Sequence, residues 1–296
     1  MATSPPQPQS QNQTPIRYVD TVEAYDKWAE VYDTDGNFLQ ALDTIEMRSL
    51  LPAFLARVAA FHSESAGSFE SESSSKSKPL KLVDLGCGTG RNTLQLLASA
   101  PAGAEIVGLD ASRGMLDVAR RAVGEKIGQI QIQRQTEERK NPTVTLEIYD
   151  LLQSPRSPPA CALGAAGAIS TLVVEHIPLD VFFESVSEIL LPGGYLLLTN
   201  MHPDMGAISQ AGFVDTATGT KIRPARSYSH TVGEVVAAAG RAGFEVVDVD
   251  GEGHGGHGVR ERSVDEGMVE LLGKRAKKWV GITVWFGVCF RKRMVP

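Results

Sequence analysis

Beyond residue 79 the chain alternates short apolar runs with stretches in which apolar residues recur at helical spacing. This alternation is typical of a parallel β-sheet that is covered by helices on both faces. The apolar runs predict strands at Leu80–Leu85, Glu105–Leu109, Val144–Tyr149, Ala168–Val174, Gly194–Thr199, Phe244–Val249 and Ile282–Phe290. The helical spacing predicts helices at Arg91–Ala100, Gly114–Val123, Leu179–Leu190 and Thr231–Ala242.

The segments before residue 80 have a different pattern. Residues 1–17 are rich in Pro, Gln, Ser and Thr, which predicts a disordered tail. Residues 18–61 have apolar side chains at helical spacing and predict two helices. Residues 62–79 are dominated by Ser, Glu and Lys and predict a flexible linker before a main domain over residues 80–296. Near the other end, the segment 252–281 exceeds an ordinary connection and predicts a lid or an insertion with a helix near Val264–Lys278.

Composition narrows the possible partners. A net charge of −6 gives no overall attraction to nucleic acid, and we interpret the basic residues near Lys274–Lys278 and Arg291–Arg293 as solvated faces. Three scattered cysteines predict neither disulfides nor a thiolate zinc site and are typical of a reducing compartment. No strongly apolar run reaches the ~18 residues of a membrane span, and no leader pattern opens the chain. We therefore expect a cytoplasmic protein.

The strongest candidate site is the loop in LKLVDLGCGTGRNTLQLL, where an apolar strand is followed by three glycines and a helix. Glycine lets the backbone turn sharply and approach a ligand, and the helix N-terminus offers free N–H groups. A dinucleotide fingerprint requires a third glycine at position 91, but Arg91 stands there. Asp84 before the loop would repel a pyrophosphate and attract a cationic ammonium or sulfonium.

Asp110 ends the second predicted strand, in EIVGLDAS. A carboxylate at this position can accept hydrogen bonds from both hydroxyls of a ribose. The alternative is that Asp110 caps the helix that begins near Gly114. Because the glycine loop precedes it, we favour ribose binding.

These motifs together resemble the class I S-adenosylmethionine-dependent methyltransferases. The resemblance rests on VDLGCGTG, on GLDAS with Met115, on YDLLQSP and on LLPGGYLLLTN, and it extends over about residues 18–250. The opening YDKWAEVYD and the later MHPDM resemble the small-molecule branch that includes the ubiquinone and menaquinone methyltransferases. The family implies a Rossmann-like three-layer α/β/α sandwich with a mostly parallel seven-stranded sheet and an antiparallel last strand.

The resemblance also implies roles for individual residues. Asp84 would lie near the cofactor's ammonium, Asp110 would hold the ribose, and Asp150 would accept from the adenine amino group. The N-terminal helices would fold over the cofactor and cap the active site. The implied cofactor residues are Asp84, Gly86, Gly88, Gly90, Asp110, Ala111, Met115, Asp150, Leu151, Thr171 and Tyr25. The family often begins its fourth strand with Phe-Asp, and this chain has Gly167 and Ala168, which puts that strand boundary in doubt.

Polar residues after the fourth and fifth strands are candidates for catalysis, because ligands bind beyond the carboxyl ends of parallel strands. We predict His202 as a general base for a hydroxyl acceptor, with His176 as the second candidate; the alternative is that each histidine caps a helix or satisfies a loop. Tyr25, Trp28 and Tyr32 at helical spacing predict either a buried helix face or substrate contacts. Their sequence spacing leaves both interpretations open.

His254 and His257 in GEGHGGHG lack a third ligand, so we expect no metal site.

The expected function is methyl transfer from S-adenosylmethionine to a small organic metabolite, with no nucleic-acid partner. Three alternatives use the same fold: a cofactor-binding enzyme that catalyses a non-methylating rearrangement or cyclisation, a protein methyltransferase, and a non-catalytic subunit of a methyltransferase complex. A nicotinamide-dependent oxidoreductase is disfavoured by the loop spacing. The sequence does not indicate the acceptor or the oligomeric state.

Overall fold

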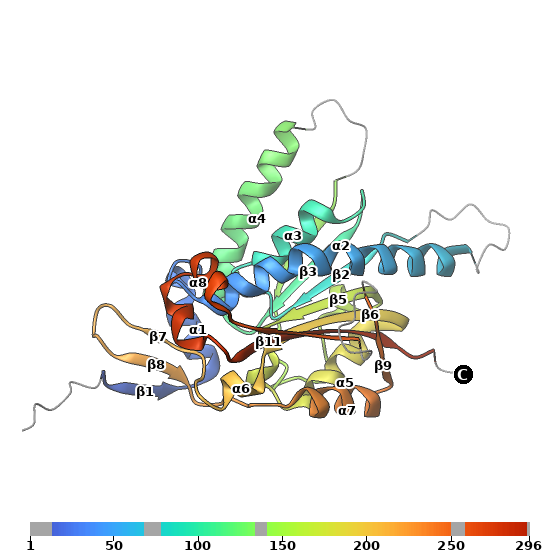
Figure 1. Cartoon of the computed structure of the whole chain (residues 1–296). Helices are drawn as coiled ribbons and strands as arrows, with labels where there is room; N and C mark the ends of the chain where they lie inside the picture. The colour runs from blue at the N-terminus through green and yellow to red at the C-terminus, as the bar shows by residue number, and fades with distance from the viewer. Residues whose placement is uncertain (1–13, 68–77, 134–140, 250–257, 295–296) are drawn as a thin grey trace, which may run out of the picture.

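An eight-stranded sheet forms the centre of the protein in a computed structural model that describes residues 14–67, 78–133, 141–249 and 258–294 (Figure 1). Its strand order is β10-β11-β6-β5-β2-β3-β4, and β9 also pairs with β11. The strands of this sheet are β2 (Lys81–Leu85), β3 (Glu105–Asp110), β4 (Thr143–Ile148), β5 (Ala165–Thr171), β6 (Leu190–Met201), β9 (Phe244–Val247), β10 (Val259–Ser263) and β11 (Thr283–Lys292). Strands β4, β3, β2, β5 and β6 run parallel, whereas β11 is antiparallel to its neighbours.

Helices cover both faces of this sheet. In Figure 1, α2, α3 and α4 lie above the sheet and α5 and α7 lie below it. These helices are α2 (Phe38–Gly67), α3 (Arg91–Ser99), α4 (Arg113–Gln133), α5 (Leu179–Ile189) and α7 (Val232–Arg241). The three layers and the antiparallel β11 confirm the predicted Rossmann-like sandwich, and β10 adds a strand to the seven that were expected.

The alternation along the central strands explains how both faces become covered. In β2, Leu82 packs in the core that contains α2 and α3, while Val83 packs in the core that contains α5 and α7. Ile106 and Val107 in β3 divide in the same way. Successive side chains of a strand point to opposite faces, so a continuous apolar run requires a helical layer on each side.

Two boundaries that were predicted for the N-terminal region differ in the structure. Residues 16–17, assigned to a disordered tail, belong to β1 (Ile16–Val19), which pairs with β8 (Lys221–Pro224) in a separate sheet completed by β7 (Phe213–Val214). A segment 205 residues further along the chain supplies the hydrogen-bonding partner, so a local pattern could not reveal this strand. Residues 62–67, assigned to the linker, continue α2 to Gly67. Residues 68–77 of the predicted linker lie outside the described residues.

The short elements that follow β1 lie next to one another in the chain. Asp20 caps α1 (Thr21–Trp28), because its carboxylate accepts from Val22 N. The 3₁₀ turn η1 (Ala29–Val31) continues α1, and α2 begins shortly afterwards.

The predicted helix at Val264–Lys278 is two elements. These are α8 (Glu266–Leu272) and the 3₁₀ helix η4 (Lys274–Trp279). Gly273 separates them with φ +86°, a conformation that breaks the helical path. β10 precedes α8, so the described part of segment 252–281 contains a strand, an α-helix and a 3₁₀ helix.

The fourth predicted strand is displaced along the chain. We expected Ala168–Val174, whereas β5 covers Ala165–Thr171. Leu172 has φ +58°, the left-handed region, and the residues after it form the 3₁₀ turn η3 (Val174–His176). The β-branched pair at 173–174 favoured a strand, but the backbone leaves the strand at Leu172.

Candidate active site

The glycine loop lies between β2 and α3, at the carboxyl end of the sheet where strand order reverses between β2 and β5. Gly86 has φ +74° and Gly88 has φ +54°. A Cβ on Gly86 would lie 2.3 Å from Val173 Cγ2, so only glycine fits there. A Cβ on Gly88 would meet nothing within 4 Å and would occupy open space. The loop therefore leaves room for a ligand at Gly88.

Asp110 joins this loop to the end of β3. Its Oδ2 accepts from Gly88 N (2.8 Å) and its Oδ1 accepts from Ser112 N (2.8 Å). Burial raises the pKa of Asp110 to about 6, against the effect of these backbone donors. Each carboxylate oxygen has a second lone-pair direction, so the side chain can still accept from a diol.

A cavity that we call the loop cavity opens beside Gly88 and Asp110. Ten predicted residues line it: Tyr25, Gly86, Gly88, Asp110, Ala111, Met115, Asp150, Leu151, Thr171 and His176. The sequence interpretation missed other lining residues, including Asp20, Ser112, Gln153, Leu172 and Arg226. Of these, Asp20 had a detectable signal, since it is a capping residue directly before a helical pattern.

Two predicted cofactor residues lie behind the loop cavity instead of lining it. Asp84 is buried; its Oδ2 accepts from Thr93 Oγ1 (2.6 Å), and its Oδ1 has no partner among the described residues. Burial raises the pKa of Asp84 to about 6. Gly90 has φ +88°, and a Cβ there would lie 3.2 Å from Ala119 Cβ, so this glycine permits close packing of α3 on α4. A cofactor role for either residue stays a prediction.

A second cavity, the aromatic cavity, adjoins the first. It shares Tyr25, Tyr32 and Leu172 with the loop cavity. Its other walls include Trp28, Phe38, Glu175, Met201, Met205, Lys221, Arg275, Lys278 and Trp279. In the predicted aromatic trio, Tyr25, Trp28 and Tyr32 pack together with ring centroids 5.0–6.0 Å apart, and all three line a cavity, so substrate contact by these residues stays a prediction.

Tyr25 and His176 form a hydrogen-bonded pair at the boundary of the two cavities. The His176 Nδ1 lies 3.3 Å from the carbonyl oxygen of Arg226, which can only accept, so the neutral ring carries its proton on Nδ1. His176 Nε2 then accepts from the Tyr25 hydroxyl at 2.7 Å. Burial, with Tyr32 and Glu175 nearby, raises the pKa of Tyr25 well above its ordinary value. Tyr25 therefore stays neutral and acts as a donor to His176.

Leu172 is also placed between the two cavities, in a strained conformation. A left-handed backbone costs a residue with a Cβ about 1 kcal/mol or more. Leu172 N donates to Thr199 O (2.9 Å), which helps to hold the strained geometry. Strain of this kind is concentrated at functional sites.

His202, the first candidate base, has the capping role that was its alternative. Its Nδ1 accepts from Asp204 N (3.2 Å) at the start of α6 (Pro203–Gly206), and its Nε2 lies 3.5 Å from Glu261 Oε1. In the described part of the chain, His202 is absent from the linings of both cavities. Of the two candidate bases, His176 is the one that lines the loop cavity, and its Nε2 is placed to accept a proton from Tyr25.

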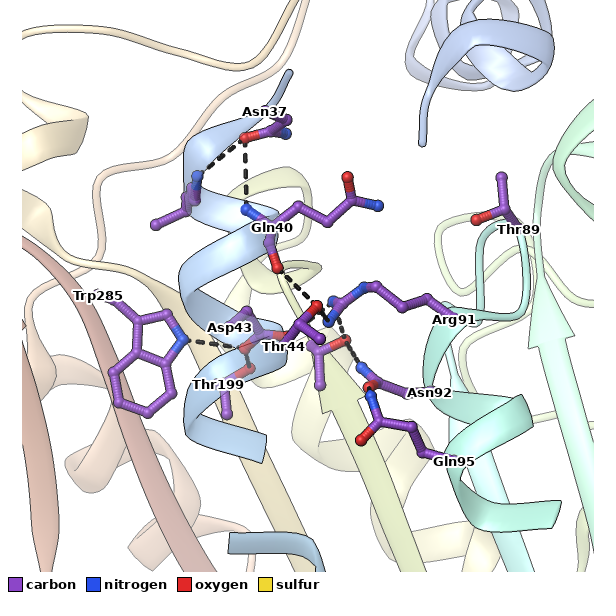
Figure 2. A network of polar contacts seen from close by, with 12 residues as sticks. Asn37, Gln40, Asp43, Thr44, Thr89, Arg91, Asn92, Gln95, Thr199 and Trp285 are labelled. Carbon is purple, nitrogen blue, oxygen red and sulfur yellow. Dashed lines mark hydrogen bonds and ion pairs between the residues drawn. The ribbon is translucent and has the colours of Figure 1, made fainter. Parts of the chain in front are cut away.

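A buried polar network behind the loop ties α2 to the sheet (Figure 2). Asp43 on α2 is fully buried; its Oδ1 accepts from Trp285 Nε1 (2.9 Å) and Thr199 Oγ1 (2.5 Å). Its Oδ2 pairs with Arg91 (2.6 Å), the residue that follows the glycine loop. Nearby, Thr89 Oγ1 donates to Asp33 Oδ1 (3.0 Å). Asp33 and Asp43 thereby attach the N-terminal segment to Thr89 and Arg91 at the glycine loop.

Asp26 makes a further link that the sequence interpretation missed. Its Oδ1 accepts from Ser112 Oγ (2.6 Å) and from Gly114 N (2.9 Å), which holds α1 against the beginning of α4. Asp26 belongs to the motif YDKWAEVYD, which was quoted without a role for this residue.

Two remaining expectations concern metal ions and membranes. Among the described residues, no group of three His, Cys, Asp or Glu side chains could hold a metal ion. His254 and His257 lie outside the described residues. In the same part of the chain, no helix is both long and apolar enough to cross a membrane.

Comparison with known proteins identifies the family. A methyltransferase-domain profile matches residues 82–194. An uncharacterised methyltransferase of Emericella nidulans is 57% identical over 280 residues, which cover 92% of this chain and 91% of the relative. The chain belongs to the methyltransferase family. The predicted class I enzyme with S-adenosylmethionine as its cofactor is thereby confirmed.

Solved structures are more distant from this methyltransferase. An S-adenosylmethionine-dependent methyltransferase from Mesorhizobium loti is 21% identical with a TM-score of 0.47, over 72% of this chain and 91% of that chain. One from Listeria monocytogenes is 16% identical with a TM-score of 0.48, over 73% and 91%. At these scores the likeness carries no argument about substrate.

The residues of the loop cavity fit the cofactor of this family. The open space at Gly88 leaves room for a ligand, and the carboxylates of Asp110 and Asp150 can each accept hydrogen bonds from it. Asp150 Oδ1 accepts from Leu152 N (2.8 Å), and none of the described residues donates to its Oδ2, which could accept from an amino group of a base. The assignments of the individual residues remain predictions.

Proposed function

We propose that this methyltransferase transfers a methyl group to a small organic metabolite bound in the aromatic cavity. One observation supports this most strongly: the aromatic cavity and the loop cavity share Tyr25, Tyr32 and Leu172. An acceptor in the first would therefore adjoin a cofactor in the second. Much of the acceleration would come from holding the two together, where effective molarities reach about 10⁵–10⁸ M.

The chemistry divides between the cofactor and the chain. Bound S-adenosylmethionine supplies an electrophilic methyl group on a sulfonium. Transfer of that methyl group to an acceptor nitrogen or oxygen would release one proton from the acceptor, and an acceptor bound as an ammonium would have to lose it before its nitrogen could attack. Tyr25 can accept this proton on its hydroxyl oxygen while its own proton moves to His176 Nε2. This pair is our assignment for proton removal, in place of His202.

We propose the type of acceptor from the net charge of the chain and the location from the state of its cysteines. The net charge of −6 favours a small-molecule acceptor over nucleic acid. Cys87, Cys161 and Cys289 are all free thiols, which supports a reducing, cytoplasmic setting.

Incubation with methyl-labelled S-adenosylmethionine and a size-fractionated cell extract tests the proposal. We expect label to enter the small organic fraction with the wild-type protein. Asp110→Ala should abolish this labelling, because the ribose loses its acceptor. Label in the protein fraction would contradict the proposal and indicate a side-chain acceptor. Tight cofactor binding without any labelled product would instead support a non-methylating reaction.

Tyr25→Phe tests the assigned proton path. We expect its labelling rate to fall about 10²-fold or more, the usual scale of general base catalysis. The affinity for S-adenosylmethionine, measured by calorimetry, should change little because the ring remains. An unchanged labelling rate would remove Tyr25 and His176 from the proton path.

A further inference from the structure

Three cations converge on the aromatic cavity. Arg275 and Lys278 come from η4, within the basic run that the sequence had suggested was a solvated face, and Lys221 comes from β8. Desolvation lowers the pKa of Lys221, and the nearby Arg223, Lys278 and Arg275 lower it further. This local concentration of positive charge stands in a chain whose net charge is −6.

The chain neutralises these cations only in part. Arg275 donates to the backbone oxygen of Asp35, and its guanidinium lies 3.9 Å from Asp35 Oδ1. Lys278 Nζ lies 4.9 Å from the centroid of the Trp279 ring. Among the described residues, no ion pair within 4.0 Å holds Lys221 or Lys278. Like charges that gather without partners at a cavity are complementary to an anion.

Two carboxylate oxygens at this cavity have no hydrogen-bond partner among the described residues: Asp35 Oδ1, which lies 3.9 Å from Arg275, and Glu175 Oε2, which has no cation of the cavity beside it in an ion pair. Glu175 is 4% exposed and follows the strained Leu172 in the chain. Its Oε1 lies 3.9 Å from His176 Nε2, and its Oε2 has no hydrogen-bond partner among the described residues. A buried acceptor without a donor costs about 1–3 kcal/mol. A ligand that donates a hydrogen bond would remove this cost.

Glu175 is near the place where the two cavities meet. It contributes to the raised pKa of both Tyr25 and Tyr32, which line both cavities. An ammonium group suits this position better than a hydroxyl, since it offers both a positive charge and N–H donors to a buried carboxylate. Aromatic rings beside the carboxylate also favour a cation.

We propose that the aromatic cavity binds an acceptor that carries an amine and an anionic group, with the amine at Glu175 and the anion at Lys221 and Lys278. This inference rests on the proposed function, because the amine end would then be the group beside the loop cavity. The enzyme would thus be an N-methyltransferase of a small amino acid or a related amine-bearing acid.

Matched sets of small probes test this inference by binding, independently of turnover. The first set is glycine, 3-aminopropanoate and 4-aminobutanoate; the second contains amines of the same lengths without the carboxylate, and the third contains the carboxylates without the amine. Affinities are measured on the full chain saturated with S-adenosylhomocysteine, through the fluorescence of the cavity residues Trp28 and Trp279. We expect one amino acid to bind about tenfold or more tightly than both of its matched analogues.

Substitutions then assign the two ends. Lys221→Met and Lys278→Met should each weaken the preferred amino acid about tenfold and leave the amine-only probe unchanged. Glu175→Gln should weaken the amine-bearing probes and leave the carboxylate-only probes unchanged. Lys277→Met is the matched control, because Lys277 lies next to Lys278 on η4 and is likewise exposed, but among the described residues it does not line the cavity. It should bind every probe as the wild type does.

Three results would overturn the inference. In the first, amine-only probes bind as tightly as the amino acids. In the second, Lys278→Met behaves like Lys277→Met. In the third, no probe binds at about 10 mM although the protein binds its cofactor. Failure of the wild-type protein to bind S-adenosylmethionine would instead count against the proposed function.

Discussion

At Asp84, burial and ionisation oppose each other. The carboxyl lies beneath the glycine loop with one hydrogen bond, from Thr93, and one oxygen without a partner among the described residues. Its pKa rises from 3.8 to about 6 because burial disfavours the charged form. The stability that Asp84 contributes is therefore fully present below pH 3.8 and is lost as the pH rises through about 6. The loss amounts to about 3 kcal/mol at pH 7.

Asp84→Asn should recover this energy in the cofactor-free protein. We expect its free energy of unfolding at pH 8 to exceed that of the wild type by about 2–3 kcal/mol, with a smaller gain at pH 5. Urea unfolding at the two pH values measures both differences. Asp117→Asn, at an exposed residue on α4, is the control and should show no such pH dependence. An equal effect of Asp84→Asn at both pH values would contradict the argument.

At the scale of elements, one buried carboxylate joins α2 to three other elements. Asp43 accepts from Trp285 and Thr199 and pairs with Arg91, so it connects α2 to β11, β6 and the start of α3 (Figure 2). A buried charge network is costly when one member is removed, because the remaining groups lose their partners. These contacts thereby help to hold α2 in its place on the sheet.

Asp43→Ala should lower the free energy of unfolding by about 3–5 kcal/mol, since it leaves Arg91 and the Trp285 N–H without their acceptor. Chemical denaturation measures the loss. Asp117→Ala breaks the exposed pair with Arg120 and should cost less than about 1 kcal/mol. A loss below about 1 kcal/mol for Asp43→Ala would show that the network is dispensable.

At the scale of the whole molecule, cofactor binding should join parts of the chain that are distant in sequence. The loop cavity is lined by residues from α1, the glycine loop, the end of β3, the segment after β4 and the end of β5. A ligand that contacts all of them stabilises the folded state as a unit. Only the assembled sheet brings these segments together.

Saturation with S-adenosylmethionine should therefore raise the unfolding midpoint temperature. At a concentration of about 100 times the dissociation constant, the gain is about 2.7 kcal/mol, or on the order of 5 °C for a chain of this size. Differential scanning fluorimetry measures the shift. NADH is the control and should give none, because the loop lacks the dinucleotide spacing. A larger shift with NADH would contradict the cofactor assignment.

The sequence alone determined the sandwich, the cofactor, through the family resemblance, and about half of the residues that line the loop cavity. Apolar strands that are buried on both faces leave continuous apolar runs in the sequence, and the sharp turn of the loop favours glycine at Gly86 and Gly88, where φ is positive. Asp110 was predictable from its place at the end of an apolar strand, whereas Asp150 was implied by the resemblance to the methyltransferase family. These signals are local, so each can be detected within a few residues.

Tertiary structure decided the features that depend on distant neighbours. β1 forms because β8 pairs with it. His202 caps α6, whereas His176 forms a hydrogen bond with Tyr25 on α1. Arg275 and Lys278 are exposed, as the sequence suggested, but only the fold shows that they also line a cavity beside Lys221. Whether a charged side chain is solvated or lines a site depends on which segments pack beside it, and only the folded chain determines those contacts.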